Sequence, residues 1–152
     1  MLVRPGFDLH ADIEKPLESR FEELNNGIKV FKEAMVAQNH WDDVTVVLVS
    51  EFARTLMGNT GNGSDHAWGG NYFIASGALD GGKMLGTFPD DLSNDGPLVF
   101  PPGIVIPTLS WEGLWDPIAR WFGVPDESLE NVLPNRADFE DNLLSLLDLF
   151  ST

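Results

Sequence analysis

The segment Val44-Thr-Val-Val-Leu-Val49 constrains the fold more than any other stretch of this sequence. It is continuously apolar or β-branched and carries no charge. A strand with one face in water alternates apolar and polar residues, whereas a strand buried on both faces forms an unbroken apolar run. The segment therefore predicts an interior strand of a parallel sheet.

The residues before this strand predict a long helix that packs across the sheet. Asp12 or one of its neighbours is the candidate N-cap, and Pro16 is tolerated in a first helical turn. A helix followed by a buried strand is typical of a βαβ unit, and a short coiled-coil seam is the less favoured alternative. The helix is indicated by one apolar stripe with three- and four-residue spacing, formed by Leu17, Phe21, Leu24, Ile28, Phe31 and Met35.

The rest of the chain completes the prediction of one α/β domain over residues 1–152. Residues 57–70 form a glycine-rich loop, and residues 86–103 should be irregular because Gly, Pro and Asp are frequent there. Apolar spacing and capping residues predict the other elements: the end of a strand at Leu2-Val3, a short strand over 71–75, a helix from Trp111 to Phe122 between Ser110 and Gly123, and a leucine-rich helix from Ala137 to Phe150.

Charge and composition exclude several classes of function. The sequence has 24 acidic and 9 basic residues, and its net charge is −15. Such a surface repels nucleic-acid phosphates and anionic lipids, so we expect no nucleic-acid partner and no membrane partner. Cysteine is absent, which removes disulfides, thiolate metal ligands and a cysteine nucleophile. Without an apolar signal-peptide core, the sequence as written predicts a cytoplasmic protein, or a periplasmic or secreted one if it derives from a longer exported parent.

Acidic and histidine side chains follow several of the predicted elements. Asp8 and His10 follow the first apolar residues, Glu51 follows the buried strand, and the pair Asp65-His66 lies in the glycine-rich loop. Ligands gather at the carboxyl ends of strands in open α/β sheets. Carboxylate oxygens and imidazole nitrogens bind zinc, manganese and iron, so these residues are candidate metal ligands. The third histidine, His40, is expected on the surface.

Other sequence motifs are incomplete. There is no Gly-x-Ser-x-Gly nucleophile motif, and the glycines of residues 58–63 do not match nucleotide-binding patterns. Asp91, Ser93, Asp95 and Gly96 match the first half of an EF-hand loop, but Pro102 stands where a bidentate glutamate is required. A looser calcium site in this loop is left open as an alternative.

Three sequence blocks resemble, in the same order, a bacterial family known as domain of unknown function 1501. The blocks are Gly6-Phe-Asp-Leu-His10, Val47-Leu-Val-Ser-Glu-Phe-Ala-Arg-Thr55 and Gly63-Ser-Asp-His-Ala-Trp-Gly-Gly70. Two later blocks, 106–111 and 120–124, resemble it as well, so that the likeness runs from Gly6 to about Asn135. The family commonly has glycine where Ala53 and Ala67 stand.

The resemblance implies a fold and a set of site residues. Members of that family are similar to alkaline phosphatases and sulfatases, which hold one or two metal ions on a doubly wound, mostly parallel sheet. By this likeness Asp8 and His10 are the first ligands, Glu51 the middle one and His66 the last. Asp65 ligates the metal or orients His66, and the metal is zinc or manganese. Arg54 faces the anionic group of a small-molecule ester.

The resemblance also implies that an amino-terminal half is missing. The family's members are longer, and their extra part, with its nucleophile, precedes the matched blocks. We therefore expect the chain to associate with a second copy or with a complementary amino-terminal half. The favoured function is the metal-binding portion of a phosphatase/sulfatase-like metallohydrolase, incomplete as a catalyst because neither Ser64 nor Thr55 carries a sign of activation. The alternatives are a non-catalytic binding or structural module and a calcium-stabilised acidic protein.

Overall fold

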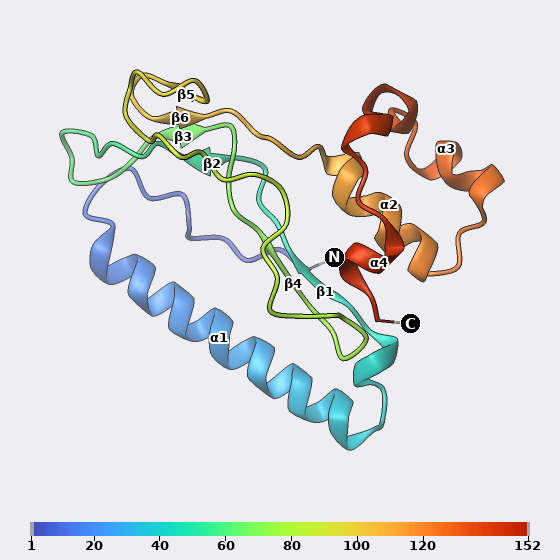
Figure 1. Cartoon of the computed structure of the whole chain (residues 1–152). Coiled ribbons are helices and arrows are strands. Elements are labelled where there is room, and N and C mark those ends of the chain that lie inside the picture. The colour runs from blue at the N-terminus through green and yellow to red at the C-terminus, as the bar shows by residue number, and fades with distance from the viewer. Residues whose placement is uncertain (1, 152) are drawn as a thin grey trace.

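The computed structural model describes residues 2–151 and shows three two-stranded sheets with helices around them (Figure 1). The long helix α1 runs beside the β1–β4 pair, and the C-terminal helices lie on the opposite side of this pair. The elements in chain order are α1 (Glu14–Ala37), η1 (Trp41–Asp43), β1 (Val46–Leu48), β2 (Ala53–Arg54), β3 (His66–Ala67), β4 (Phe73–Ala75), β5 (Val99–Phe100), β6 (Ile104–Val105), α2 (Trp111–Trp121), η2 (Asp126–Ser128), α3 (Leu129–Val132), η3 (Arg136–Asn142) and α4 (Leu146–Leu149).

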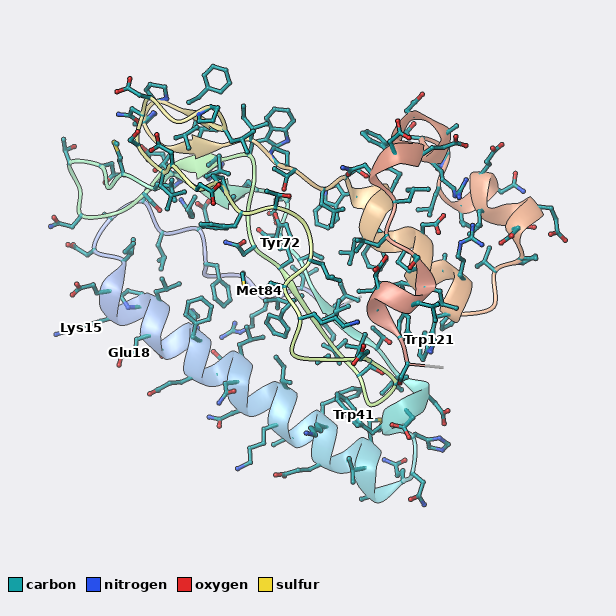
Figure 2. The ribbon with its side chains drawn as sticks, viewed as in Figure 1. Lys15, Glu18, Trp41, Tyr72, Met84 and Trp121 are labelled. Carbon is teal, nitrogen blue, oxygen red and sulfur yellow. The ribbon has the colours of Figure 1, made fainter. Side chains whose placement is uncertain are left out.

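The helix α1 confirms the long helix predicted from the apolar stripe. The stripe is only half covered, and no residue of α1 is buried. Lys15 and Glu18 point away from the rest of the molecule (Figure 2). The N-cap is Ile13, the neighbour of Asp12, and no side chain caps the helix, so the predicted capping by Asp12 itself is wrong. The backbone N–H groups of Asp12 and Ile13 donate instead to the carbonyls of Gly61 and Asn62, so that a tertiary contact fixes the start of the helix.

The strand β1 corrects the prediction for the segment 44–49. It is shorter than predicted, is half-buried, and pairs antiparallel with β4, with Val47 opposite Ile74. Its sheet has two strands, so β1 is an edge strand in the described chain and not an interior parallel strand. All three residues of β1 are half-buried, so the apolar run agrees with partial cover on both faces of the strand. Val47 packs toward the C-terminal helices, and its neighbours along the strand point to the α1 side.

The other strands also pair antiparallel, and they correct the expectation of a doubly wound parallel sheet. β2 pairs with β3, and β5 pairs with β6, each over two residues. Among residues 2–151 no strand pair is parallel. The first part of the glycine-rich loop connects β2 to β3, which itself lies within the predicted loop, and the predicted strand over 71–75 is confirmed as β4. The chain is therefore a mixed α/β structure built from short hairpin-like pairs.

The buried core lies between the β1–β4 pair and the C-terminal helices. Ile118, Leu149 and Phe150 form its centre, and Trp121 stacks on Phe150 with ring centroids 4.9 Å apart. The predicted helix at 111–122 is confirmed as α2, with Ser110 as its N-cap and Gly123 after its end at a φ of +94°.

The C-terminal tail differs from the single helix predicted over 137–150. It forms the 3-10 segment η3 and the short helix α4, separated by an extended turn at Leu143. Leucines on most sides of a continuous helix would need cover all round. The break lets Leu149 turn into the core while Leu147 stays exposed. The strand end predicted at residues 2–3 is not observed, because both residues are exposed and have no assigned secondary structure.

Within the described residues, no helix is both long and apolar enough to cross a membrane.

Candidate metal centre

Three candidate ligands meet where the segment before α1 contacts the β2–β3 pair. Asp8 and His10 lie on the irregular segment that precedes α1, and His66 is the first residue of β3. The pairing of β2 with β3 places Arg54 opposite His66. The contact of the helix start with the glycine-rich loop brings the two segments together. Side chains separated by more than 50 residues therefore share one site.

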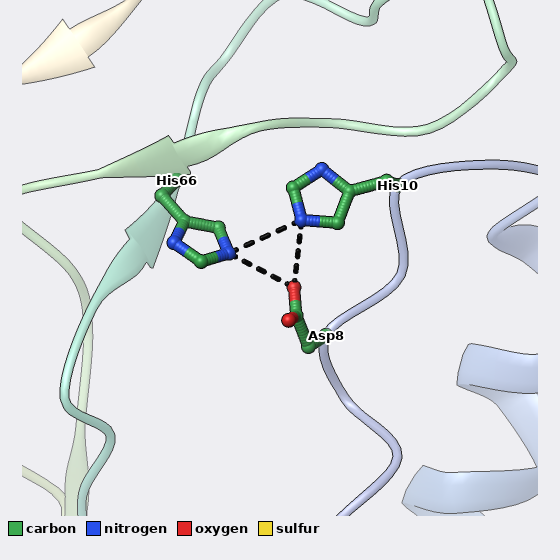
Figure 3. Close-up of side chains that lie close together, drawn as sticks. All are labelled: Asp8, His10 and His66. Atoms are coloured by element: carbon green, nitrogen blue, oxygen red, sulfur yellow. Dashed lines mark hydrogen bonds and ion pairs between the residues drawn. The ribbon is translucent and has the colours of Figure 1, made fainter.

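The donor atoms of Asp8, His10 and His66 form a nearly equilateral triangle (Figure 3). The Nε2 atoms of His10 and His66 are 3.2 Å apart. Each of these nitrogens is 3.0 Å from Oδ1 of Asp8. All three residues are exposed, with about half of each side chain in contact with solvent. The site is an open cluster on the surface.

This triangle fits the coordination of a divalent transition metal. With metal–donor bonds of about 2.0–2.1 Å in a tetrahedron, neighbouring donors lie about 3.3 Å apart. The observed edges of 3.0–3.2 Å are close to that spacing. A circle through the three atoms has a radius of about 1.8 Å, which is shorter than a metal–donor bond, so all three atoms are close enough together to hold one ion. Three ligands would leave one tetrahedral position open.

Asp65 and Asn59 orient the ring of His10. The Nδ1 atom of His10 lies 3.1 Å from Oδ1 of Asp65. Asn59 donates its amide to the same Asp65 oxygen at 2.9 Å and to the carbonyl oxygen of His10 at 3.0 Å. These hydrogen bonds, first from Asn59 and then from His10, hold the pKa of the Asp65 carboxyl below its usual value. Asp65 is thus a charged acceptor for the far side of the His10 ring.

The ring of His66 is fixed by stacking. Phe52 lies against it with ring centroids 3.7 Å apart and an interplanar angle of 11°. The guanidinium group of Arg54 lies over the Phe52 ring, 5.3 Å from its centroid. Because the stack restrains the imidazole plane, the Nε2 atom of His66 is aimed at Asp8.

Arg54 links the segment before α1 to the segment before β3 through hydrogen bonds. Its guanidinium donates to the carboxylate of Asp8 and to the carbonyl oxygens of Phe7 and Ser64. The hydrogen bond with His66, and in second place the bond from Arg54, keep the pKa of the Asp8 carboxyl below its usual value. The predicted contact of Arg54 with a substrate anion stays a prediction, and the structure adds that this side chain already binds Asp8.

Gly63 allows the two segments of the site to touch. A Cβ atom built on Gly63 would lie 2.2 Å from the carbonyl carbon and oxygen of His10. The side-chain oxygen of Asn59 accepts hydrogen bonds from the backbone N–H groups of Gly61 and Gly63, which fixes the turn. The glycine-rich loop is therefore a close-packed support for His10.

The structure gathers some of the predicted site residues and leaves one outside. Asp8, His10 and His66 share the cluster, and Asp65 contacts His10, not His66 as expected. Glu51 is not in the ligand group. It is exposed, beside Ser50, and its charge acts with burial to raise the pKa of Tyr72. Its backbone lies between β1 and β2, one residue before Phe52, but the three residues whose donor atoms converge are Asp8, His10 and His66.

Sequence reasoning missed Asn59 and Phe52. Phe52 directly follows the predicted ligand Glu51, and Asn59 lies in the glycine-rich loop, but an amide and an aromatic ring in such positions are common and carry no specific signal. Their roles become visible only when the loop folds against His10. The acidic loop at 91–96 forms a local turn in which Asp91 accepts from the Ser93 N–H. It is not part of a ligand group among the described residues.

Thr55 and Ser64, the hydroxyls considered as nucleophiles, are both buried. The Thr55 hydroxyl donates to the carbonyl of Met57 and accepts from the N–H of Asp65. It therefore positions Asp65, and its donor and one acceptor site are already used.

Fold and site together define a mixed α/β protein with an exposed aspartate–histidine cluster. The chain belongs to the family described as Protein of unknown function (DUF1501), which matches residues 1–96. That range contains the whole cluster together with Asn59, Phe52 and Arg54, and it ends before the two later blocks of resemblance. No curated protein and no solved structure matches the chain.

Proposed function

We propose that this protein binds a divalent transition metal, zinc or manganese, through Asp8, His10 and His66. The observation that carries the proposal is the triangle of donor atoms with edges of 3.0–3.2 Å. Two imidazoles and one carboxylate form a donor set that zinc accepts readily. Exposed acidic groups often occur without an ion, but here two imidazole nitrogens and one carboxylate oxygen, from segments more than 50 residues apart, lie within 3.2 Å of one another.

The residues around the cluster prepare it for a cation. Ionised Asp65 can only accept a hydrogen bond, so the Nδ1 atom of His10 carries the proton. In the neutral ring this leaves the Nε2 lone pair directed at the centre. The carboxylate of Asp8 adds one negative charge, which is held ionised by His66 and Arg54. Each ligand is thus oriented by a neighbour from the same site.

We further propose that the metal serves phosphoric or sulfuric ester hydrolysis of the alkaline-phosphatase or sulfatase kind. A divalent metal bound there supplies Lewis-acid polarisation of a phosphoryl or sulfuryl oxygen. Arg54 would exchange its contact with Asp8 for the anionic group of the ester, since an arginine fork suits such oxygens. Membership of the family and the donor set support this part of the proposal. Neither Thr55 nor Ser64 has the contacts of an activated nucleophile, so the attacking group would be a water that the metal activates.

A non-catalytic metal-binding module is the second candidate. The observation that favours it is exposure: about half of each ligand side chain meets solvent, whereas hydrolytic sites exclude water around the reacting group. The two candidates share the metal and differ only in turnover.

Metal titration tests the shared part. Zinc should bind to the wild-type protein with one equivalent per chain. His10→Ala and His66→Ala should each weaken binding at least about 100-fold, because two remaining ligands hold zinc poorly. His40→Ala is the matched control, since His40 pairs with Asp43 on the surface at a different place. Equal affinity in all four proteins would refute the site.

Hydrolysis assays on the metal-loaded protein test the remaining part. Nitrophenyl phosphate and nitrophenyl sulfate are suitable substrates because each reports cleavage directly. Metal-dependent turnover that His66→Ala abolishes would support the hydrolase. Tight zinc binding without turnover of either ester would leave the non-catalytic module.

A further inference from the structure

The accessible surface of this chain is much larger than that of a folded monomer of its mass. Its area is 10351 Å². A compact monomer of 16.8 kDa exposes about 7,700 Å². The excess of about 2,700 Å² per chain is comparable with the 1,000–2,500 Å² or so that each subunit buries in an obligate homodimer.

The outer edge of β1 is one of the strand edges that the described chain leaves unpaired. β1 pairs with β4 on one side, and among the described residues no other backbone group bonds to the segment 44–49. The outer edge of β4 is unpaired as well, but the chain just after β4 is joined to the C-terminal residues, because Leu79 pairs with Phe150 and the N–H of Ser151 donates to the carbonyl of Ala78. An edge strand with apolar side chains on both faces is a template for a further strand.

The helix α1, which runs beside the β1–β4 pair (Figure 1), adds a second incompletely covered apolar surface. It has no buried residue along its 24 positions. Phe21 and Phe31 of its stripe are 51% and 40% exposed. Both the strand edge and the helix stripe therefore need cover from outside.

The charge distribution selects a second copy of the chain as that cover. α1 carries five glutamates and four basic residues, a net charge of −1, and the segment 44–49 carries none. The remaining −14 of the chain lies on other parts. Two copies can meet through β1 and α1 without bringing their acidic surfaces face to face, so that burial of apolar area outweighs the screened repulsion elsewhere.

We propose that this protein forms a twofold homodimer in which β1 pairs antiparallel with β1 of a second copy. The result is a four-stranded sheet in the order β4-β1-β1-β4, with the two α1 helices side by side on one face. The interface is isologous, because the twofold axis is perpendicular to the sheet. One residue of each β1 therefore lies opposite the same residue of the second copy.

Cysteine scanning gives a sharp test, because the natural sequence contains no cysteine. Cysteine is placed singly at positions 45 to 49. Under mild oxidation only the self-opposed position should form a disulfide-linked dimer, since opposite Cα atoms in such a pair lie about 4.5–5.5 Å apart. Phe73→Cys on β4, which is 40% exposed, is the matched control and should not cross-link.

Light scattering and one charge variant complete the test without requiring oxidation. At about 10 μM the wild-type protein should have twice the chain mass of 16.8 kDa. Val49→Lys, which places a cation at the paired edge, should weaken dimerisation at least about 10-fold. Val132→Lys, at a residue 53% exposed on the C-terminal helices, should not. Circular dichroism confirms that each variant is folded.

Three outcomes would overturn the proposal. The first is a folded monomer at this concentration. The second is a dimer whose cross-links do not involve residues 45–49. The third is a monomer that becomes stable only when a different chain is added, which would assign the β1 edge to a complementary partner.

Discussion

At the scale of single residues, Asn59 links more of the candidate metal centre than any predicted ligand does. Its amide donates to Asp65 and to the backbone of His10, and its oxygen accepts from Gly61 and Gly63. It therefore fixes both the loop and the acceptor that orients His10. Outer partners of this kind commonly change metal affinity as strongly as a weak ligand does.

Asn59→Ala should lower zinc affinity by about 10- to 100-fold, because Asp65 and the loop lose their common anchor. The measurement is a calorimetric zinc titration, with Asn131→Ala on the exposed surface as the control. The nitrogen chemical shifts of His10 in the metal-free protein provide a second readout, since loss of the Asp65 contact should mix the two ring tautomers. An unchanged affinity and tautomer would show that the anchor is dispensable.

In the C-terminal half, Asp116 links two elements through its hydrogen bonds, as Asn59 does at the metal centre. It is 2% exposed. It accepts from Arg120 at 2.6 Å within α2 and from Arg136 at the start of η3. This carboxylate joins two elements and neutralises the arginines that approach it.

Asp116→Asn should reduce the free energy of unfolding by about 3 kcal/mol, because it removes the charge shared by two arginines and points an amide donor at one of them. Chemical denaturation measures the change. Asp141→Asn alters an exposed carboxylate near the same segment and should shift stability by less than about 0.5 kcal/mol. If both variants unfold alike, the ion triad adds nothing to stability.

At the scale of elements, α2 is the helix whose ends follow most directly from its own sequence. The Ser110 hydroxyl accepts from the N–H of Gly113 at 3.0 Å. Pro117 lies inside the helix, yet α2 continues past it to Trp121. A helix with an internal proline depends more than usual on its cap and on packing.

Ser110→Ala should destabilise the protein by about 1 kcal/mol, because one N–H of the first turn loses its acceptor. Thermal unfolding followed by circular dichroism measures this change. Ser19→Ala, in the exposed face of α1, provides the control and should be neutral or slightly stabilising, since alanine favours helix. A Ser110→Ala melting curve that matches the control would contradict the capping role.

The short helix α4 should make stability depend on pH through its capping box. Hydrogen bonds from the Ser145 hydroxyl and N–H hold the pKa of Asp148 below its usual value. A lowered folded-state pKa stabilises the fold above the unfolded value of about 3.9, and this contribution disappears as pH falls through the folded-state pKa. The melting-temperature difference between wild type and Ser145→Ala should therefore be constant from about pH 5 to 7 and shrink below about pH 4. A difference independent of pH would argue against the box.

At the scale of the whole molecule, the net charge of −15 opposes a compact fold. Raising ionic strength from about 0.01 M to about 0.1 M shortens the screening length from about 30 Å to about 10 Å. Sodium chloride should raise the melting temperature by a few degrees over this range, since repulsion among distant carboxylates weakens. Choline chloride should act equally. A rise with calcium at micromolar concentration, absent with both salts, would instead support the calcium-stabilised alternative.

Much of the local structure was predictable because it depends on residues near one another in the chain. The stripe from Leu17 to Met35 predicted α1, since helical spacing alone creates its apolar face. Ser110 and Gly123 predicted the ends of α2, since caps act over a few residues. The prediction of a single helix over 137–150 was wrong, because local spacing does not show which leucines turn inward. That choice depends on the tertiary surface against which they pack.

The sequence by itself determined which side chains could bind a metal, and the tertiary structure decided which of them meet. Asp8, His10 and His66 come together because the loop at 61–63 packs on the segment before α1, a contact that Gly63 permits by lacking a side chain. Glu51 stays outside the cluster. The run at 44–49 required cover on both faces, but not a parallel neighbour. Strand partners are chosen by contacts distant in sequence, and an apolar pattern records burial without recording direction.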